Sequence, residues 1–220
     1  MVHDKSSHRG RTRARTGRGR GKYDRTQSAE ERRELQRGLL LDAATTVFAA
    51  RGFAGATVEA IIEKAGMSRR TFYDHFEDIH DVLHQVHDRA SGIAFRVVSE
   101  LVHAEPDPIE RIRTGITAYM TMIATHPQVA SVVLREVRSA GPAYEPRREL
   151  ETTRYASLLF EALAAAHAAK KTARPPDELT VYALATAIEA VAMRYIARRE
   201  EARAAEAAPK LVELVLRAFG

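Results

Sequence analysis

The sequence predicts an all-α protein in which a small three-helix unit precedes a larger helical bundle, with about nine helices in all. Apolar residues recur at helical spacing along most of the chain from Ser28 onward. No segment alternates apolar and polar residues as a half-buried strand does, and no repeat of solenoid period is present. Gly and Pro fall at intervals that end one helix and begin the next.

The composition excludes several classes of protein. The chain has 220 residues, 45% of them hydrophobic, and contains no cysteine. Disulfides, thiolate metal sites and cysteine nucleophiles are therefore excluded. No window approaches the 18 or more uninterrupted apolar residues of a membrane span, and the arginine-rich N-terminus lacks the apolar stretch of a signal peptide. We expect a soluble, cytoplasmic protein with no membrane partner.

Positive charge is concentrated at the N-terminus. Residues 1–25 carry nine Lys or Arg and two Asp, whereas the rest of the chain carries 25 basic and 27 acidic residues. Arginine alternates there with Gly, Ser and Thr, without apolar periodicity. Residues 1–27 are thus predicted to be a basic disordered arm, attracted to nucleic acid or an anionic membrane surface, or simply a solubilising extension.

Capping residues mark the three helices of the N-terminal unit, residues 28–76. Ser28 is placed to cap the first helix, which Gly52 ends. The Thr57 hydroxyl can cap the short segment VEAIIEKA, which Gly66 ends. A third helix begins at Ser68.

Two phenylalanines orient the third helix. Met67 and Phe72 have the spacing of a hydrophobic staple, and Phe72 and Phe76 lie four residues apart on one side. If that side faces a core, the opposite side presents polar residues to solvent: Arg69, Arg70 and Tyr73.

The segment from residue 77 to 220 is predicted to be helical throughout. Its first helix is long, and Pro108 is well placed to start the next one, which Pro127 ends. A short helix QVASVVLREVRSA follows. Three more helices are expected at about 146–171, 176–203 and 209–218. An apolar stripe should bury one face of the long first helix: Ile79, Val82, Leu83, Val86, Ala90 and Ile93.

The N-terminal unit has the pattern of a helix-turn-helix, whose second helix enters the DNA major groove. Arg69 and Arg70 can donate to guanine, and Thr71 can contact a thymine edge. Other hydroxyl and ring groups, together with the backbone N–H groups at helix starts, suit phosphate oxygens. The candidate DNA-binding residues are Thr57, Ser68, Arg69, Arg70, Thr71, Tyr73 and His75.

The run RGFAGATVEAIIEKAGMSRRTFYDHFED, preceded by LLLDAATTVF, resembles the DNA-binding region of the TetR family of bacterial transcriptional regulators. The likeness covers residues 37 to about 83. It rests on matching positions: Gly52, Phe53, Thr57, Ile61, Ala65, Gly66, Ser68, Thr71, Tyr73 and Phe76. It implies a repressor that binds a pseudo-palindromic double-stranded operator as a homodimer through its last two helices. A small-molecule effector, bound in a ligand-binding and dimerisation domain over residues 77–220, would release it.

Two positions depart from the family pattern. The second helix usually carries a small alanine where this sequence has Ile62, so the third helix is expected slightly further away or at a changed angle. The fourth helix usually begins with a phosphate-contacting lysine, and this sequence has Ile79 there. That contact is not carried over; His80 or the basic arm could supply the charge instead.

The resemblance also implies a ligand pocket in the C-terminal domain. Candidate lining residues are apolar with a few polar groups, although each could equally be ordinary core. They are Phe95, Tyr119, Met120, Ile123, Tyr155, Phe160, Glu189 and Met193.

Neither a cofactor nor catalysis is expected. His80, His84 and His87 fall at i, i+4 and i+7, but a complete metal-ligand set is lacking, so we predict a solvated face and no metal site. No Gly-rich phosphate loop, nucleophile elbow or paired carboxylates stand out, so the protein is predicted not to be an enzyme.

Two other functions remain open on the sequence. The arginine-rich arm could serve a nonspecific or architectural nucleic-acid binder, with the helices acting only to dimerise it. Alternatively, the helical bundle could be an enzyme or a small-molecule carrier without DNA function.

Overall fold

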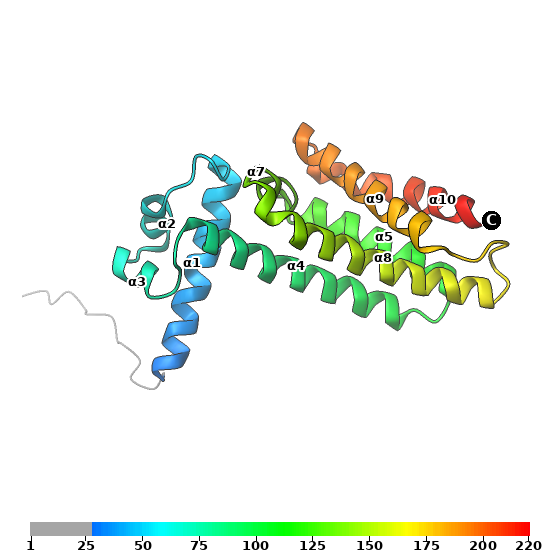
Figure 1. The fold of residues 1–220 in the computed structure, drawn as a ribbon, viewed down its shortest axis with the longest axis horizontal. Coiled ribbons are helices and arrows are strands. Elements are labelled where there is room, and N and C mark those ends of the chain that lie inside the picture. The colour runs from blue at the N-terminus through cyan, green and yellow to red at the C-terminus, as the bar shows by residue number, and fades with distance from the viewer. Residues whose placement is uncertain (1–27) are drawn as a thin grey trace, which may run out of the picture.

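A computed structural model describes residues 28–220, which contain helices and no strand. The all-α prediction is confirmed for this part of the chain, and the predicted basic arm, residues 1–27, lies outside it. Helices α1 (Ala29–Arg51), α2 (Val58–Ala65) and α3 (Arg69–Tyr73), here called the head, lie at one end of the molecule. The remaining helices, here called the body, extend away from the head, and α4 (Ile79–Ala104) runs from one into the other (Figure 1).

The helices of the head begin at the predicted residues because each has a side-chain cap. Ser28 and Glu31 form a reciprocal capping box at α1. The Thr57 hydroxyl accepts a hydrogen bond from the Ala60 N–H at α2, and the Ser68 hydroxyl accepts one from Thr71 at α3. These local contacts fix the three helix starts.

The body consists of α4 and the helices that follow it. Asp107 caps α5 (Pro108–Thr125), in which Pro108 occupies the first turn as predicted. A short 3-10 helix η2 (Pro142–Tyr144) leads into α8 (Glu145–Ala168). Helix α9 (Glu178–Arg198) ends at Arg199 in a left-handed conformation, earlier than the predicted residue 203. The 3-10 helix η3 (Glu201–Ala207) and α10 (Ala208–Phe219) complete the chain.

Between α5 and η2 lies one continuous helix with an unusual centre. Helix α6 (Pro127–Ala130) passes into a π-helical segment η1 (Ser131–Glu136), which passes into α7 (Val137–Ser139). Because η1 joins α6 and α7, residues 28–220 contain nine separate α-helical rods, as predicted. The sequence did not indicate the π-helix.

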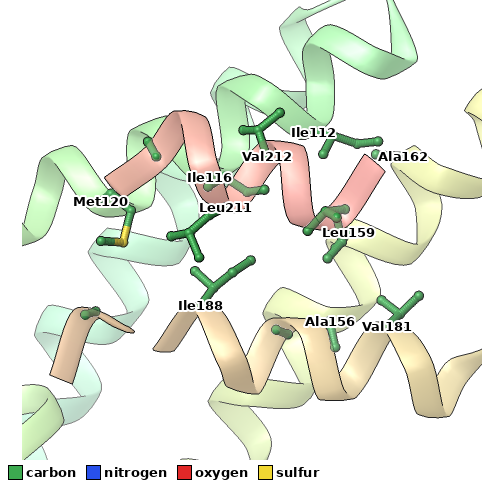
Figure 2. Packing of buried hydrophobic residues seen from close by; sticks show 14 of the residues in the cluster. Ile112, Ile116, Met120, Ala156, Leu159, Ala162, Val181, Ile188, Leu211 and Val212 are labelled. Atoms are coloured by element: carbon green, nitrogen blue, oxygen red, sulfur yellow. The ribbon is translucent and has the colours of Figure 1, made fainter. Parts of the chain in front are cut away.

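Two main apolar clusters hold the structure together. In the body, α10 packs against α5, and residues of α5, α8, α9 and α10 share one apolar cluster. Figure 2 shows Leu211, Ile188 and Ile116 directed into this shared interior. The second cluster is formed by the head and the start of α4, and it also includes residues of the body: Val132, Val137 and Tyr144. The head is therefore anchored to the η1–α7–η2 region as well as to α4.

The structure corrects two details predicted for α4. Ile93 was expected in the buried stripe but its side chain is 48% exposed. The three histidines do not form a solvated face: His80 is exposed, but His87 is 2% exposed and the His84 ring packs 4.4 Å from the Tyr144 ring. The sequence pattern of α4 could not show where neighbouring helices cover it.

Candidate DNA-binding surface and ligand cavity

Helix α3 is held on the head by its apolar side. Phe72 is fully buried and Phe76 nearly so, with their ring centroids 5.5 Å apart. Gly66, with φ of 66°, takes the left-handed conformation that ends α2 and allows the chain to turn into α3. The opposite side of α3 faces solvent, and the Tyr73 side chain is 47% exposed. This is the orientation that a recognition helix needs.

The two arginines of α3 have different surroundings. The Arg69 guanidinium forms an ion pair with Glu59 of α2 and lies 5.6 Å from the centroid of the Tyr73 ring. Arg70 is exposed, and no carboxylate of the described residues pairs with it. Arg70 therefore has free donors for an incoming acceptor, whereas Arg69 has to leave or share Glu59.

The other predicted DNA-binding residues lie around the same surface. Thr57 and Ser68 are at the starts of α2 and α3, and the Thr71 hydroxyl lies 2.9 Å from that of Ser68. His75 follows α3; burial and the nearby Arg33 lower its pKa below the ordinary value. Ser68, Thr71, Arg69 and Tyr73 are thus joined by contacts within α3 and its cap, and His75 lies near Arg33 of α1.

Arg33 of α1 was not among the predicted site residues. Its guanidinium donates to the Asp74 carbonyl at the end of α3, with a distance of 3.1 Å. This contact brings positive charge from α1 to the edge of the surface. The sequence carries no sign of this contact, because its two residues are 41 positions apart.

The start of α4 shows what replaces the family lysine. Ile79 packs against the apolar cluster of the head, so it serves the core. The His80 ring lies 4.8 Å from the Phe53 ring, and its carbonyl accepts a hydrogen bond from the Tyr144 hydroxyl. His80 is thus used to join the head to the body.

The body contains a cavity of about 660 Å³, within the size range of small-molecule sites. Its wall is built by α4, α5, the α6–α7 rod, α8 and α9, and α1 of the head also contributes Leu41, Asp42, Thr45 and Thr46. The exposed lining residues come mainly from α1, α4 and the α5–α6 junction. The cavity therefore opens beside the head.

The cavity has a polar end and an apolar end. Arg138 of α7 forms an ion pair with Glu189 of α9, and Thr152 of α8 donates to the same carboxylate over 3.1 Å. These groups lie toward the head, since α8 begins there (Figure 1). The far end is lined mainly by aliphatic side chains, with Arg111 of α5 beside them: Val98, Val102, Ile112, Ile116, Leu158 and Ala162.

Several polar groups in the wall keep unused hydrogen-bonding capacity. Arg148 Nε and Glu151 Oε2 are buried and have no partner among the described residues. The Glu151 Oε1 atom accepts from Ser91 over 3.3 Å. Burial raises the pKa of Tyr119 well above its ordinary value, and Glu189 raises it further. Its hydroxyl therefore stays protonated and able to donate.

Half of the predicted ligand-binding residues line the cavity. Tyr119, Ile123, Tyr155 and Glu189 belong to its wall. The other four lie outside it: Met120 is fully buried in the body core, Phe160 and Met193 pack beside that core, and Phe95 packs on Tyr155 with Arg154 over its ring.

The charged residues of the cavity wall were not among the predicted site residues. Arg138, Arg148 and Glu151 line the cavity, and Glu136 is buried beside it at 4% exposure. Glu136 carried a usable signal: it lies four residues after Val132 and directly before Val137, both of which are buried. A charged residue within an apolar stripe marks a specific internal contact.

A helix-turn-helix head with an outward second helix, joined to a helical body with a ligand cavity, defines a ligand-responsive DNA-binding regulator. The protein families that this chain matches are of the same class. Residues 40–86 match the model of bacterial regulatory proteins of the tetR family, and residues 105–217 match that of the tetracyclin repressor-like C-terminal domain. The chain belongs to the TetR family, and it is a DNA-binding transcriptional repressor with a ligand-binding C-terminal domain.

Solved structures share this fold over most of the chain. The fatty acid degradation regulator FadR from Bacillus halodurans is 19% identical, with a TM-score of 0.75 over 82% of this chain and 94% of that one. FadR from Bacillus subtilis, in complex with stearoyl-CoA, is 17% identical, with a TM-score of 0.74 over 83% and 99%. A TetR-like regulator from Rhodococcus sp. RHA1 is 25% identical, with a TM-score of 0.63 over 84% and 96%.

Proposed function

We propose that this protein represses transcription in the cytoplasm by binding a pseudo-palindromic operator as a homodimer, and that an amphipathic long-chain acyl compound releases it. In this proposal residues 28–76 bind DNA, and residues 77–220 bind the effector and dimerise. The observation that carries the proposal is the position of the cavity: its polar end and its opening lie against the DNA-binding head, and part of its wall is α1.

The proposed DNA contacts follow from exposure and residue type. Arg70 donates to a base edge, Arg69 does so after leaving Glu59, and Thr71 contacts a neighbouring base. The remaining contacts position the protein on the phosphates through Thr57, Ser68, Tyr73 and His75.

The proposed effector class follows from the shape and polarity of the cavity. From Arg148 to Ala162 the cavity follows α8 for about 21 Å, at a rise of about 1.5 Å per residue. The mainly apolar part, from Tyr155 to Ala162, takes about half of this length and suits an alkyl chain, and the polar end offers donors to a carbonyl. The fold shared with FadR, solved with stearoyl-CoA, supports a fatty acyl-CoA.

A coenzyme A group is too polar for the aliphatic arm, so we place it at the opening. The exposed lining residues there include Arg89 and His126, which suit phosphate oxygens. Arg89 now pairs with Asp42 of α1, with a distance of 2.5 Å. A phosphate that takes Arg89 away from Asp42 would loosen one contact between α4 and the head.

The proposed dimer forms through α9 and α10. The outer side of α9 exposes small and apolar residues, among them Leu179, Ala183 and Ala190, and Leu179 is 78% exposed. On α10, Leu214 is also exposed. Such a surface generally marks an interface between proteins.

The proposal is tested by selecting DNA from a random pool and then titrating ligands against the recovered duplex. We expect a pseudo-palindromic motif, and release of the protein by stearoyl-CoA but not by coenzyme A alone. Stearate serves as a second control, since it has the chain without the nucleotide. Recovery of no preferred sequence would refute operator binding. Recovery of a motif with no response to either acyl compound would refute the effector class only.

A further inference from the structure

A buried carboxylate of the body is fixed to the head. Glu136, at the end of η1, is 4% exposed. Its Oε2 atom accepts a hydrogen bond from the backbone N–H of Phe53 over 2.8 Å, and its Oε1 atom accepts one from Arg135 Nε over 2.7 Å. Phe53 lies in the loop between α1 and α2. The contact therefore joins segments 83 residues apart, one in each part of the molecule.

The head is shaped to receive this carboxylate. Gly52 has a φ of 70°, and a Cβ atom at this position would lie 3.3 Å from Glu136 Oε2. A bare glycine therefore permits the close approach. The Phe53 ring packs 5.9 Å from the Phe48 ring of α1 and 4.8 Å from the His80 ring of α4, measured between centroids. Phe53 is thus tied to both helices that carry the recognition unit.

The helix that carries Glu136 also forms the cavity wall. Val133, Leu134 and Arg138 line the cavity, whereas Val132 and Val137 belong to the apolar cluster of the head. One rod thus has the effector site on one face and the head on the other. Its centre is π-helical, a rare geometry that is frequent at functional sites.

We propose that Glu136 is a positioning residue that couples the cavity to the DNA-binding head through η1; this inference rests on the proposed function above. An occupant that pushes on Leu134, or that draws Arg138 from Glu189, changes the winding of η1. The π-helix can absorb that change by returning locally to α-helical winding, which rotates Glu136. The Phe53 N–H then loses its acceptor, and the loop that sets the position of α2 and α3 moves.

Thermodynamic linkage gives a test that needs no effector. If the cavity biases the head, operator binding must bias the cavity wall by the same free energy. We would measure hydrogen–deuterium exchange of residues 131–138, with and without the selected operator duplex. The full-length dimer would be used, as wild type and as Glu136→Ala, Glu136→Asp and Glu136→Gln. Ser139→Ala is the control, since it alters the same rod and leaves the Phe53 contact intact.

In the wild type, the duplex should change exchange in residues 131–138. Glu136→Ala and Glu136→Asp should lose that change even at saturating duplex, because neither reaches the Phe53 N–H. Both should also bind the duplex more weakly than wild type, since the loop that positions α2 and α3 is no longer held. Glu136→Gln keeps an acceptor oxygen and should keep the change, as should Ser139→Ala. If Glu136→Ala does not fold, the comparison of Glu136→Asp with Glu136→Gln still tests the proposal, because only the second keeps an acceptor within reach of the Phe53 N–H.

If the duplex changes exchange of residues 131–138 in Glu136→Asp or Glu136→Ala as much as in the wild type, the inference is overturned. It is also overturned if the duplex leaves exchange of these residues unchanged in the wild type. Failure of the wild type to bind any selected duplex is a different result, since it refutes the proposed function.

Discussion

Arg69 of the recognition helix is paired with Glu59 of the preceding helix, across the turn of the helix-turn-helix. Both side chains are largely exposed, so the pair adds little to stability. Its effect is on the DNA-binding surface, where it occupies one of two adjacent arginines and leaves Arg70 free. The two arginines should therefore differ in their contributions to binding.

Arg70→Ala should weaken operator binding by about 1–3 kcal/mol and relax the preference at one base position, as expected for loss of a bidentate base contact. Arg69→Ala should cost less, because in the free protein its donors are already engaged by Glu59. Quantitative binding to the selected operator and to single-base variants measures both effects. Glu59→Gln is the matched control and should bind more tightly, since it frees Arg69. Equal losses for the two arginines would contradict this difference.

Filling the apolar end of the cavity should make the repressor insensitive to its effector. Ala162 is 3% exposed and lines the cavity, so Ala162→Phe places a ring where the acyl chain would lie. Stearoyl-CoA binding, measured by calorimetry, should weaken at least about tenfold, or about 1.4 kcal/mol. Operator affinity should be unchanged.

Ala168→Phe is the control for this change, because Ala168 is exposed at the end of the same helix. Wild-type effector affinity in Ala162→Phe would place the acyl chain elsewhere.

Acidification should destabilise the junction of head and body through His84. Burial, followed by the nearby Arg147, lowers the pKa of His84 below the ordinary 6.5, and Asp88 opposes the shift. The folded state therefore binds a proton less readily than the unfolded state. The stabilisation that neutral His84 gives to the folded state should be fully present above pH 6.5. It should decline as the pH falls from 6.5 toward the pKa of His84 in the folded state.

His84→Phe should flatten part of this decline, because phenylalanine can pack on Tyr144 and does not titrate. Denaturant midpoints across a pH series measure the effect. Some dependence should persist, since the pKa of His75 is lowered as well. A pH profile identical to wild type would show that His84 is not responsible.

A charge on the outer side of α9 should prevent dimerisation. Ala190 is exposed on that side, and Ala190→Arg would bring two like charges together across a two-fold interface. Light scattering should then give the monomer mass, and operator affinity should fall because two half-sites can no longer be held together. Ala50→Arg, on the exposed side of α1, should remain dimeric. A dimeric Ala190→Arg protein would place the interface elsewhere.

Features that depend on neighbours in the chain were predictable. Ser28, Thr57 and Ser68 cap the helices of the head at the expected residues because a cap joins a side chain to a backbone N–H two or three residues later. Phe72 and Phe76 were placed in the core by their spacing alone. The helix-turn-helix and its outward arginines follow from these short-range relationships.

Features that depend on distant segments were not predictable. Helical periodicity indicates an apolar face, but it does not say whether that face meets a packed core or an empty space. Met120 and Tyr119 are adjacent in the sequence, yet Met120 is core and Tyr119 lines the cavity. Whether each side chain is core or cavity wall depends on how the helices of the body pack together.

The sequence by itself determined most of the helices, the order of the two parts and the residues that turn α3 outward, because these depend on contacts within a few residues. Only the tertiary structure decided that Glu59 holds Arg69, that the cavity has its polar end beside the head, and that Glu136 reaches Phe53. Each of these joins segments whose separation in space is set by the folded packing.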